Sequence, residues 1–362
     1  MHRTPPSPGR PRPARPYGGA PAAAGDALAL GALTVLLLLL APLLLLLGLL
    51  RPLLPARAAG AARLPLVWAA YLAGFSLTAL AGSLRLRARG AGPDAWRLLT
   101  ARCGRRFRRL AGRWSGLRFR IEPPDPMPDP GRPVIVLARH AGILNTQLAF
   151  TAVTAVLGLR PRGIAKRCVA LEPGLRALLR GIPLALFRWD RAGRAAALAE
   201  LTAQSRSLGP GEALWLYPEG TNYSAARRSA SIARLRARGQ HALADRAEAM
   251  PHLLPPHLPG ALAVLAAAAP GTQVLVCGHT GPERLLPWML GPGYAPGPGD
   301  LVRLRWWTFR ADRVPTDPAR FADWLYDRWH HLDTWIAATT DPAAPHRPHT
   351  HTHTHTEDLD PA

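Results

Sequence analysis

Side chains able to move a proton follow several apolar segments of the chain. The first of these segments, residues 134–138, is entirely apolar and leads into Arg139 and His140. A neutral imidazole can take a proton from an alcohol near pH 7, so His140 is a candidate general base. A histidine after an apolar segment is also common as a structural residue, and this pattern alone leaves both interpretations open.

A carboxylate and a glycine turn follow a second apolar segment. Residues 214–217 run directly into a Pro-Glu-Gly-Thr turn that contains Glu219, Gly220 and Thr221. Gly220 permits close approach of the backbone to an anion, and Thr221 adds a hydroxyl group. Ligands of α/β domains bind at the carboxyl ends of the strands, so we expect Glu219 to share one sheet edge with His140.

Arginines and a second histidine follow two further apolar segments. Arg188, Arg191 and Arg194 come after residues 184–187, and together they could hold a phosphate through charge-assisted hydrogen bonds. In a chain with 45 Lys and Arg residues, such a cluster can also arise by chance. His279 ends the other segment in a Gly-His-Thr-Gly setting without a partner pattern, so we expect it to be structural or to line the cleft.

These apolar segments alternate with stretches of helical periodicity. The alternation predicts an α/β fold with a mostly parallel central sheet flanked by helices. The expected strands are residues 117–121, 134–138, 163–165, 184–187, 213–217, 274–277 and 301–309. The expected helices between them are residues 148–157, 171–179 and 195–205, with an exposed helical excursion over residues 225–250.

The N-terminal part predicts a hydrophobic helical hairpin over residues 27–84. Residues 27–50 carry no charge, and a helix of that length spans about 36 Å, enough for the hydrocarbon core of about 30 Å. A second uncharged stretch, residues 64–84, argues against a cleaved signal peptide. The hairpin can span the cell membrane or re-enter one leaflet, and the flanking arginines place the catalytic domain on the cytoplasmic side.

Three other segments are predicted from composition. Residues 1–26 form a disordered basic N-terminus, and residues 341–362 form a disordered His/Thr tail. Residues 85–114 interleave arginines with aromatic and leucine residues, which favours a basic amphipathic segment on an anionic membrane surface. A helix whose aromatic residues face the protein core is the alternative.

The net charge of +22 indicates a polyanionic partner. Without a motif that reads bases, nucleic acid is disfavoured, and anionic membrane lipid is the expected partner because two apolar stretches adjoin the arginines. The three cysteines are widely spaced, which excludes a disulfide scaffold and a Cys-rich zinc site.

The order of these blocks resembles the lysophosphatidic acid acyltransferase (1-acyl-sn-glycerol-3-phosphate acyltransferase) family of glycerolipid acyltransferases. Members carry His, four residues, Asp; then an Arg after an apolar strand; then Phe/Tyr-Pro-Glu-Gly-Thr and a final apolar strand. The resemblance covers residues 115–340, the expected acyltransferase domain. The Arg-His-Ala-Gly start of the first block and Trp-Leu-Tyr-Asp at residues 324–327 indicate an actinobacterial branch.

The resemblance implies transfer of a fatty acyl group from acyl-CoA or acyl-carrier protein to the hydroxyl of a lysophospholipid. The expected acceptor is 1-acylglycerol-3-phosphate, which gives phosphatidic acid, and no metal, cofactor or covalent intermediate is implied. The implied catalytic residues are His140, Asn145 and Glu219, and the implied substrate-binding residues are Arg188, Arg191, Gly220 and Thr221.

Asn145 departs from the family pattern, because relatives carry Asp at this position. An amide oxygen can hold the imidazole, but it does not supply the negative charge that stabilises an imidazolium. The same exchange in a serine-protease triad lowers turnover about 10⁴-fold. An active enzyme, a weakly active one and a catalytically impaired lipid-binding homologue therefore all remain open.

Overall fold

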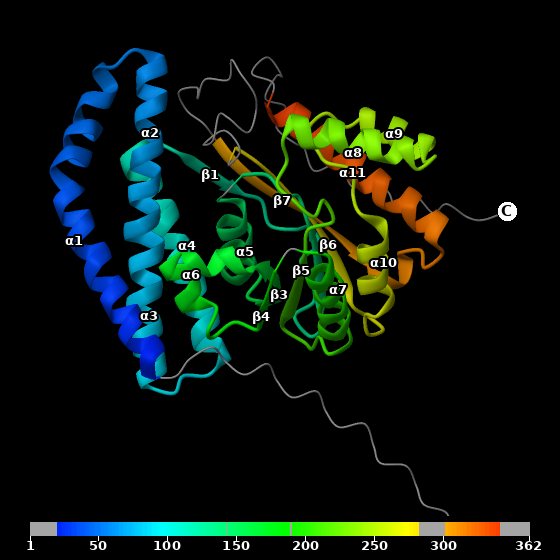
Figure 1. Cartoon of the computed structure of the whole chain (residues 1–362), viewed down its shortest axis with the longest axis horizontal. Helices are drawn as coiled ribbons and strands as arrows, with labels where there is room; N and C mark the ends of the chain where they lie inside the picture. Colours follow the sequence, from blue (N-terminus) through cyan, green and yellow to red (C-terminus); the bar gives the residue numbers. More distant parts are fainter. Residues whose placement is uncertain (1–19, 143, 189, 282–300, 341–362) are drawn as a thin grey trace, which may run out of the picture.

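The computed structural model describes residues 20–142, 144–188, 190–281 and 301–340, and within them seven strands form one sheet (Figure 1). Their order across the sheet is β1-β7-β6-β2-β5-β3-β4. The strands are β1 (Arg118–Ile121), β2 (Val134–Ala138), β3 (Arg160–Lys166), β4 (Leu184–Phe187), β5 (Glu212–Leu216), β6 (Gln273–Thr280) and β7 (Leu301–Arg310). Only the β6–β7 pair is antiparallel among these strands, which confirms the predicted mostly parallel sheet.

Helices cover both faces of the sheet, and the central strands are therefore apolar on both sides. In β2, Val134 and Val136 belong to one hydrophobic core, whereas Ile135 and Leu137 belong to the other. A strand buried on both faces has a continuous apolar run instead of an alternating one. This explains why β2 could be located from the sequence.

The helices divide between the two faces. The first core is formed with α4 (Pro93–Ser115), α5 (Asn145–Val156), α6 (Pro173–Leu178) and parts of the N-terminal helices. The second core is formed with α7 (Arg191–Arg206), α8 (Ala225–Ala237), α9 (His241–Glu248), α10 (Leu258–Ala266) and α11 (Pro318–Thr340). In Figure 1 these two sets lie on opposite sides of the sheet.

The predicted hairpin is present as α1 (Ala20–Leu50), followed by α2 (Ala56–Tyr71), a π-helical turn (Leu72–Ser76) and α3 (Leu77–Ala88). Helix α1 starts before residue 27, so residues 20–26 are helical and not disordered as expected. Alanines with high helix propensity begin this segment. In addition, Asp26 is fully buried against the guanidinium group of Arg180, which fixes the start of α1 on α6.

The two arms of the hairpin differ in exposure. Both are long and apolar enough to cross a bilayer, but α1 is exposed, whereas most of the second arm is buried inside the protein. Tyr71 of the second arm is 2% exposed and stacks on Phe75 with ring centroids 5.1 Å apart. The second arm therefore packs as part of the first core, and α1 presents most of the free apolar surface.

Helix α4 corresponds to most of the predicted basic amphipathic segment. Its aromatic residues Trp96 and Phe107 are buried, in agreement with the alternative in which they face the core. Its exposed face carries Arg102, Arg105 and Arg106 among other arginines. The face of α4 that could contact an anionic membrane surface is therefore its basic face, while its aromatic face is buried.

Candidate active site

His140 lies at the carboxyl edge of the sheet, directly after β2 and Arg139. The register pairs Leu137 of β2 with Leu216 of β5, so the residues that follow these two strands meet. The imidazole of His140 stacks on the phenol ring of Tyr217, with centroids 4.2 Å apart and an interplanar angle of 23°. The main-chain N–H of Tyr223 also donates to the His140 carbonyl at 2.7 Å. The loop after β5 therefore holds His140 through both its ring and its backbone.

The Glu219 carboxyl group lies under this loop and is 1% exposed. Its Oε1 accepts the main-chain N–H of His140 at 3.0 Å, and its Oε2 accepts the main-chain N–H of Leu254 at 3.3 Å. Burial raises the pKa of Glu219 to about 8, although the neighbouring charge of Arg139 and the two N–H donors act in the opposite direction. Glu219 therefore positions the backbone of His140, and it is not among the described residues that line the adjacent cavity.

A buried polar layer supports His140 from the side of β6. The Arg139 guanidinium group donates to the carbonyl oxygens of His279 at 2.5 Å and His252 at 3.0 Å. The His279 ring is fully buried, and its Nε2 lies 3.1 Å from the Arg139 carbonyl oxygen. His279 is therefore structural, one of the two roles expected for it.

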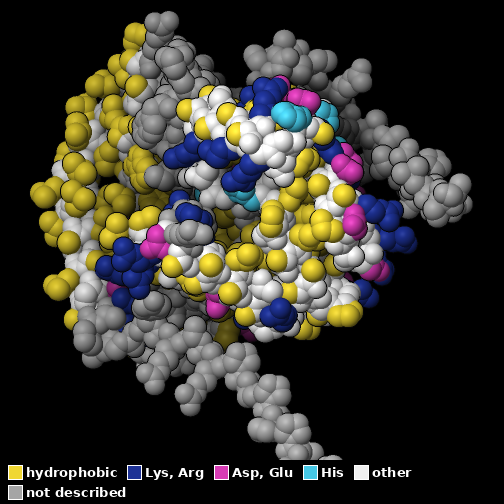
Figure 2. Space-filling model, turned by 45° about the vertical axis from the view of Figure 1, so that its right-hand side comes forward, with side chains coloured by type: hydrophobic (Ala, Val, Ile, Leu, Met, Phe, Trp, Pro, Cys, Tyr) yellow, Lys and Arg dark blue, Asp and Glu magenta, His cyan; other side chains and the backbone are white. Residues whose placement is uncertain are grey.

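Beside His140, the protein encloses a cavity of about 590 Å³. This volume falls within the range of small-molecule sites, about 300–1,000 Å³. Its wall is mostly apolar and comes from α2, the π-helical turn, α5, α6 and the strand edge. Apolar residues of the wall include Trp68, Tyr71, Phe75, Leu144, Phe150, Val169, Leu175, Leu178, Ile182, Leu184 and Trp215. In Figure 2 the molecular face is hollowed beside the helices at its apolar edge, with basic side chains around the hollow.

The wall also contains polar residues, among them Glu172, whose carboxyl group is bound to Ser76 and to the main chain at the start of α6. The turn after β5 supplies two further lining residues. Gly220 and Asn222 line the cavity together with Lys166, the residue at the end of β3. Gly220 has a φ of +67°, a conformation that favours glycine, and a Cβ at this position would meet the His257 ring at 3.0 Å. At Gly220, the Pro-Glu-Gly-Thr turn therefore exposes its main chain directly to the edge of the cavity, because glycine has no side chain to cover it.

The surroundings of His140 keep its imidazole neutral. Burial lowers the pKa of His140 to about 3, and the positive charges of His279, Lys166 and Arg227 act in the same direction. A neutral ring can accept a proton. The charged groups that lower this pKa are all cationic, and each of them opposes formation of the imidazolium.

The structure brings some of the predicted site residues to the cavity and not others. His140 and Gly220 line it, and Thr221 is half-buried in the same turn. Arg188 does not reach the cavity, because its side chain is 76% exposed and lies 3.5 Å from Asp190. The side chains of Arg191 and Asn145 lie outside the described residues.

Lys166 is the cation that the sequence reasoning missed. It is the single lysine of the chain and stands at the carboxyl end of β3, both of which are visible in the sequence. The prediction concentrated on clustered arginines and overlooked this isolated ammonium group. Within the described part of the chain, no three His, Cys, Asp or Glu side chains are arranged to hold a metal ion.

The fold and the site define an α/β protein with a histidine at the edge of an apolar cavity. No family model matches the chain, and no curated protein matches it. Among solved structures, the chain is similar to the crystal structure of the 1-acyl-sn-glycerophosphate (LPA) acyltransferase, PlsC, from Thermotoga maritima. The match has a TM-score of 0.45 and 16% sequence identity, and covers 67% of this chain and 81% of that chain. These values do not assign a family, so the functional argument rests on the site.

Proposed function

We propose that the protein is an acyltransferase that moves a fatty acyl group from a thioester to the hydroxyl of a phosphate-bearing lysolipid. The observation that carries the proposal is the position of a neutral imidazole beside an apolar cavity of about 590 Å³ that also contains one ammonium group. The apolar wall suits an acyl chain, and His140 suits a hydroxyl that must lose its proton. The order of sequence motifs supports the same chemistry.

The reaction requires one proton acceptor and no covalent intermediate on the protein. His140 takes the proton of the acceptor hydroxyl as its oxygen attacks the thioester carbonyl carbon. The carbon–sulfur bond then breaks, and His140 gives the proton to the departing sulfur, so that a thiol leaves and the imidazole is neutral again. Binding both lipids in one cavity makes the attack effectively unimolecular, which lowers the barrier.

Lys166 fits the phosphate of the acceptor. Its ammonium group lines the cavity and lies near enough to His140 to lower the pKa of the imidazole. A bound phosphate would neutralise this charge and place negative charge near the ring, which raises a histidine pKa. We infer that the phosphate of 1-acylglycerol-3-phosphate supplies the charge that Asn145 does not provide.

The exposed apolar surface of α1 supports a location at the cell membrane. Its leucines are largely uncovered in the protein, for example Leu38 at 68% and Leu39 at 74% exposure. A basic face on α4 favours the cytoplasmic side of an anionic bilayer. The acyl donor is acyl-CoA or acyl-carrier protein, both of which are present on that side.

The proposal is tested with the full chain purified in a non-ionic detergent. Acyl-CoA and acyl-carrier-protein donors are each combined with lysophosphatidic acid, lysophosphatidylcholine or monoacylglycerol, and acyl products are measured by mass spectrometry. We expect phosphatidic acid from wild type, and a rate at least about 10²-fold lower for His140→Ala. If neither wild type nor Asn145→Asp forms any acyl product, the proposal that the protein is an acyltransferase is wrong.

A lipid-binding protein without turnover is the second candidate. Asn145 and the cations around His140 favour it, because both oppose formation of an imidazolium. The turnover of Asn145→Asp with acceptors that have or lack a phosphate distinguishes the enzyme from the binding protein. If the acceptor phosphate compensates for Asn145, this variant gains most with monoacylglycerol, which has no phosphate. Lysolipid binding with turnover equal to that of His140→Ala would support the binding protein instead.

A further inference from the structure

A second pocket, separate from the cavity at His140, opens between α1, α3 and α4. It has a volume of about 280 Å³, equivalent to about nine water molecules at 30 Å³ each. No described residue lines both this pocket and the larger cavity. The two lie on different sides of the second hairpin arm, since Tyr71 and Phe75 face the cavity and Ala73 and Leu77 face the pocket.

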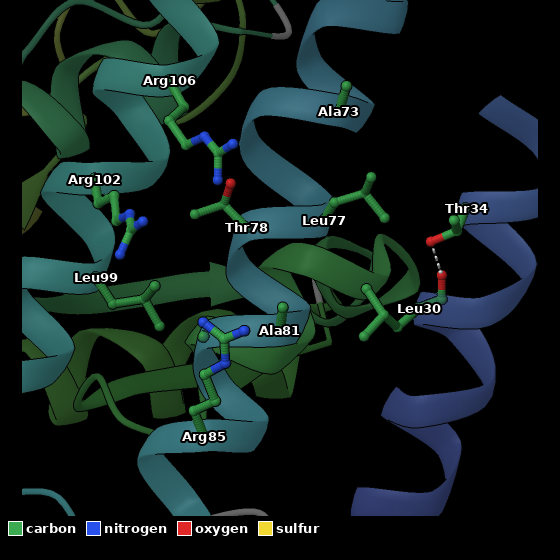
Figure 3. Close-up of a pocket in the computed structure, with 11 residues that line it drawn as sticks. Leu30, Thr34, Ala73, Leu77, Thr78, Ala81, Arg85, Leu99, Arg102 and Arg106 are labelled. Atoms are coloured by element: carbon green, nitrogen blue, oxygen red, sulfur yellow. Dashed lines mark hydrogen bonds between the residues drawn. The ribbon is translucent and has the colours of Figure 1, made fainter. Parts of the chain in front are cut away.

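The polar lining of this pocket is cationic. Arg102 and Arg106 enter it from α4, and Arg85 enters it from α3 (Figure 3). None of the described residues that line it is acidic. In the part of the chain that the structure describes, these three guanidinium groups make no hydrogen bond or ion pair. Three unneutralised arginines around one small space are arranged to bind an anion.

Thr78 gives an independent indication of a ligand. Its side chain is 7% exposed, and its Oγ1 is buried without a hydrogen-bond partner among the described residues. Figure 3 shows this hydroxyl on α3 directed toward the guanidinium group of Arg106. A buried hydroxyl without a partner is costly, and a phosphate oxygen in the pocket would satisfy it.

The surroundings of the pocket indicate the kind of anion. Leu30 and Thr34 of α1 form the wall opposite α4 (Figure 3). Beyond Thr34, α1 continues as an uncovered apolar surface, with Leu38 and Leu39 more than two-thirds exposed. A free phosphate would use only the arginines and Thr78, whereas a phospholipid would also place its acyl chains along α1. We propose that this pocket binds the phosphate of an anionic phospholipid, as a site distinct from the acyl-transfer site.

The test uses the full chain in non-ionic detergent, with phosphatidylglycerol as the probe and phosphatidylcholine of the same chain length as the reference. Phosphatidylglycerol has no free phosphate monoester, so it differs from the proposed acceptor. Lipid retained by the protein is measured by native mass spectrometry. We expect wild type to retain phosphatidylglycerol in preference to phosphatidylcholine.

Two variants and one matched control examine the pocket. The Arg102→Gln/Arg106→Gln pair is expected to weaken phosphatidylglycerol binding at least about tenfold, and Thr78→Val about threefold or more without changing the charge. The control pair Arg105→Gln/Arg109→Gln removes the same charge from exposed positions of the same helix that do not line the pocket. Phosphatidylglycerol binding by the control pair should stay within about twofold of wild type, because these substitutions leave the pocket intact and reduce only the diffuse electrostatic attraction.

Three results would overturn this proposal. Equal losses in both arginine pairs would show diffuse attraction, and unchanged binding by Thr78→Val would show that the hydroxyl makes no contact. Displacement of phosphatidylglycerol by inorganic phosphate at about 10 mM would identify a site for a free anion. The acyl-transfer assay is scored separately, so failure of that proposal leaves this one intact. Melting temperatures identify any variant that fails to fold.

Discussion

Replacing Glu219 tests whether the His140 backbone is held by a buried carboxyl group. Both oxygens of Glu219 accept main-chain N–H groups, those of His140 and Leu254. Glu219→Gln keeps the shape, but its amide nitrogen accepts no hydrogen bond, so one buried N–H loses its partner. A protonated carboxyl group, in contrast, retains acceptor capacity on both oxygens.

The expected cost follows from this count. One unsatisfied buried N–H lowers the free energy of unfolding by about 1–3 kcal/mol, and Glu219→Ala, which leaves two, by about twice as much. At roughly 2–4 °C per kcal/mol, Glu219→Gln should melt about 2–12 °C below wild type. Since Glu219 does not line the cavity, kcat should fall while KM for the acceptor changes little.

The matched control is Glu212→Gln, at the start of the strand that precedes Glu219. Glu212 forms a partly exposed ion pair with Arg162 at 3.0 Å and accepts the main-chain N–H of Gly209 on the same oxygen. The glutamine keeps one oxygen that can accept this N–H, so the variant removes the ion pair, which contributes about 0–1 kcal/mol. Circular dichroism melts and initial rates with lysophosphatidic acid provide the measurement. If Glu219→Gln melts and turns over like Glu212→Gln, the positioning role of Glu219 is wrong.

The pH dependence of stability gives a second test of Glu219. Burial raises its pKa to about 8, so the folded protein holds this proton more tightly than the unfolded chain does. The resulting stability is complete below the ordinary glutamate pKa, and it decreases as the pH rises through about 8. Wild type should therefore lose more melting temperature than Glu219→Gln between about pH 5.5 and pH 8.5. Equal slopes for the two proteins would contradict the raised pKa.

Three further outcomes follow from the structure. Gly220→Ala should lower the free energy of unfolding by about 1–3 kcal/mol or more, because φ is +67° and the His257 ring is 3.0 Å away. The control is Gly239→Ala, where φ is +72° but no atom is close, so its loss of melting temperature measures the backbone strain alone. With the His140 pKa lowered to about 3, kcat/KM should show no loss near pH 6.5 on acidification, and a sigmoidal fall there would contradict the neutral base. Asp26→Asn should weaken the docking of α1 by about 3–5 kcal/mol, detected as faster proteolysis in that helix, while the exposed Asp94→Asn should not.

The sequence predicted the strand bounds best where a strand is a short, uninterrupted apolar run. β2 and β4 have the expected bounds, because they are uninterrupted apolar runs. β3 starts three residues earlier than expected, at Arg160, and β6 extends to Thr280. The first extension contains arginines and a proline, and the second contains Gly278 and a buried histidine. Pairing with neighbouring strands overrides these local signals, and such pairing is not visible in one segment of sequence.

The sequence predicted which strand-end residues reach the candidate site, but it did not predict which cationic side chain lies there. His140 and Gly220 reach the cavity because strand ends in a parallel sheet share an edge, which alternating elements already imply. Arg188 follows a strand in the same way, yet Asp190 pairs with it and also caps α7 by accepting the N–H of Gly193. That local arrangement keeps Arg188 in solvent. Only the folded chain shows that Lys166 lies at the cavity instead.

The π-helical turn explains how one helical arm can serve two different surfaces. An extra residue in a turn rotates the following helix by about 100° relative to a regular α-helix. Tyr71, before the turn, and Phe75, within it, face the cavity, whereas Ala73, within the turn, and Thr78, after it, face the arginine pocket. Gly74 lies within the turn, and a Cβ there would come within 2.8 Å of the Phe107 main chain on α4. In a regular helix, Thr78 would share one face with Tyr71 and Phe75, since residues four and seven positions apart lie on the same side. The turn therefore directs the buried Thr78 hydroxyl away from the cavity and to the pocket.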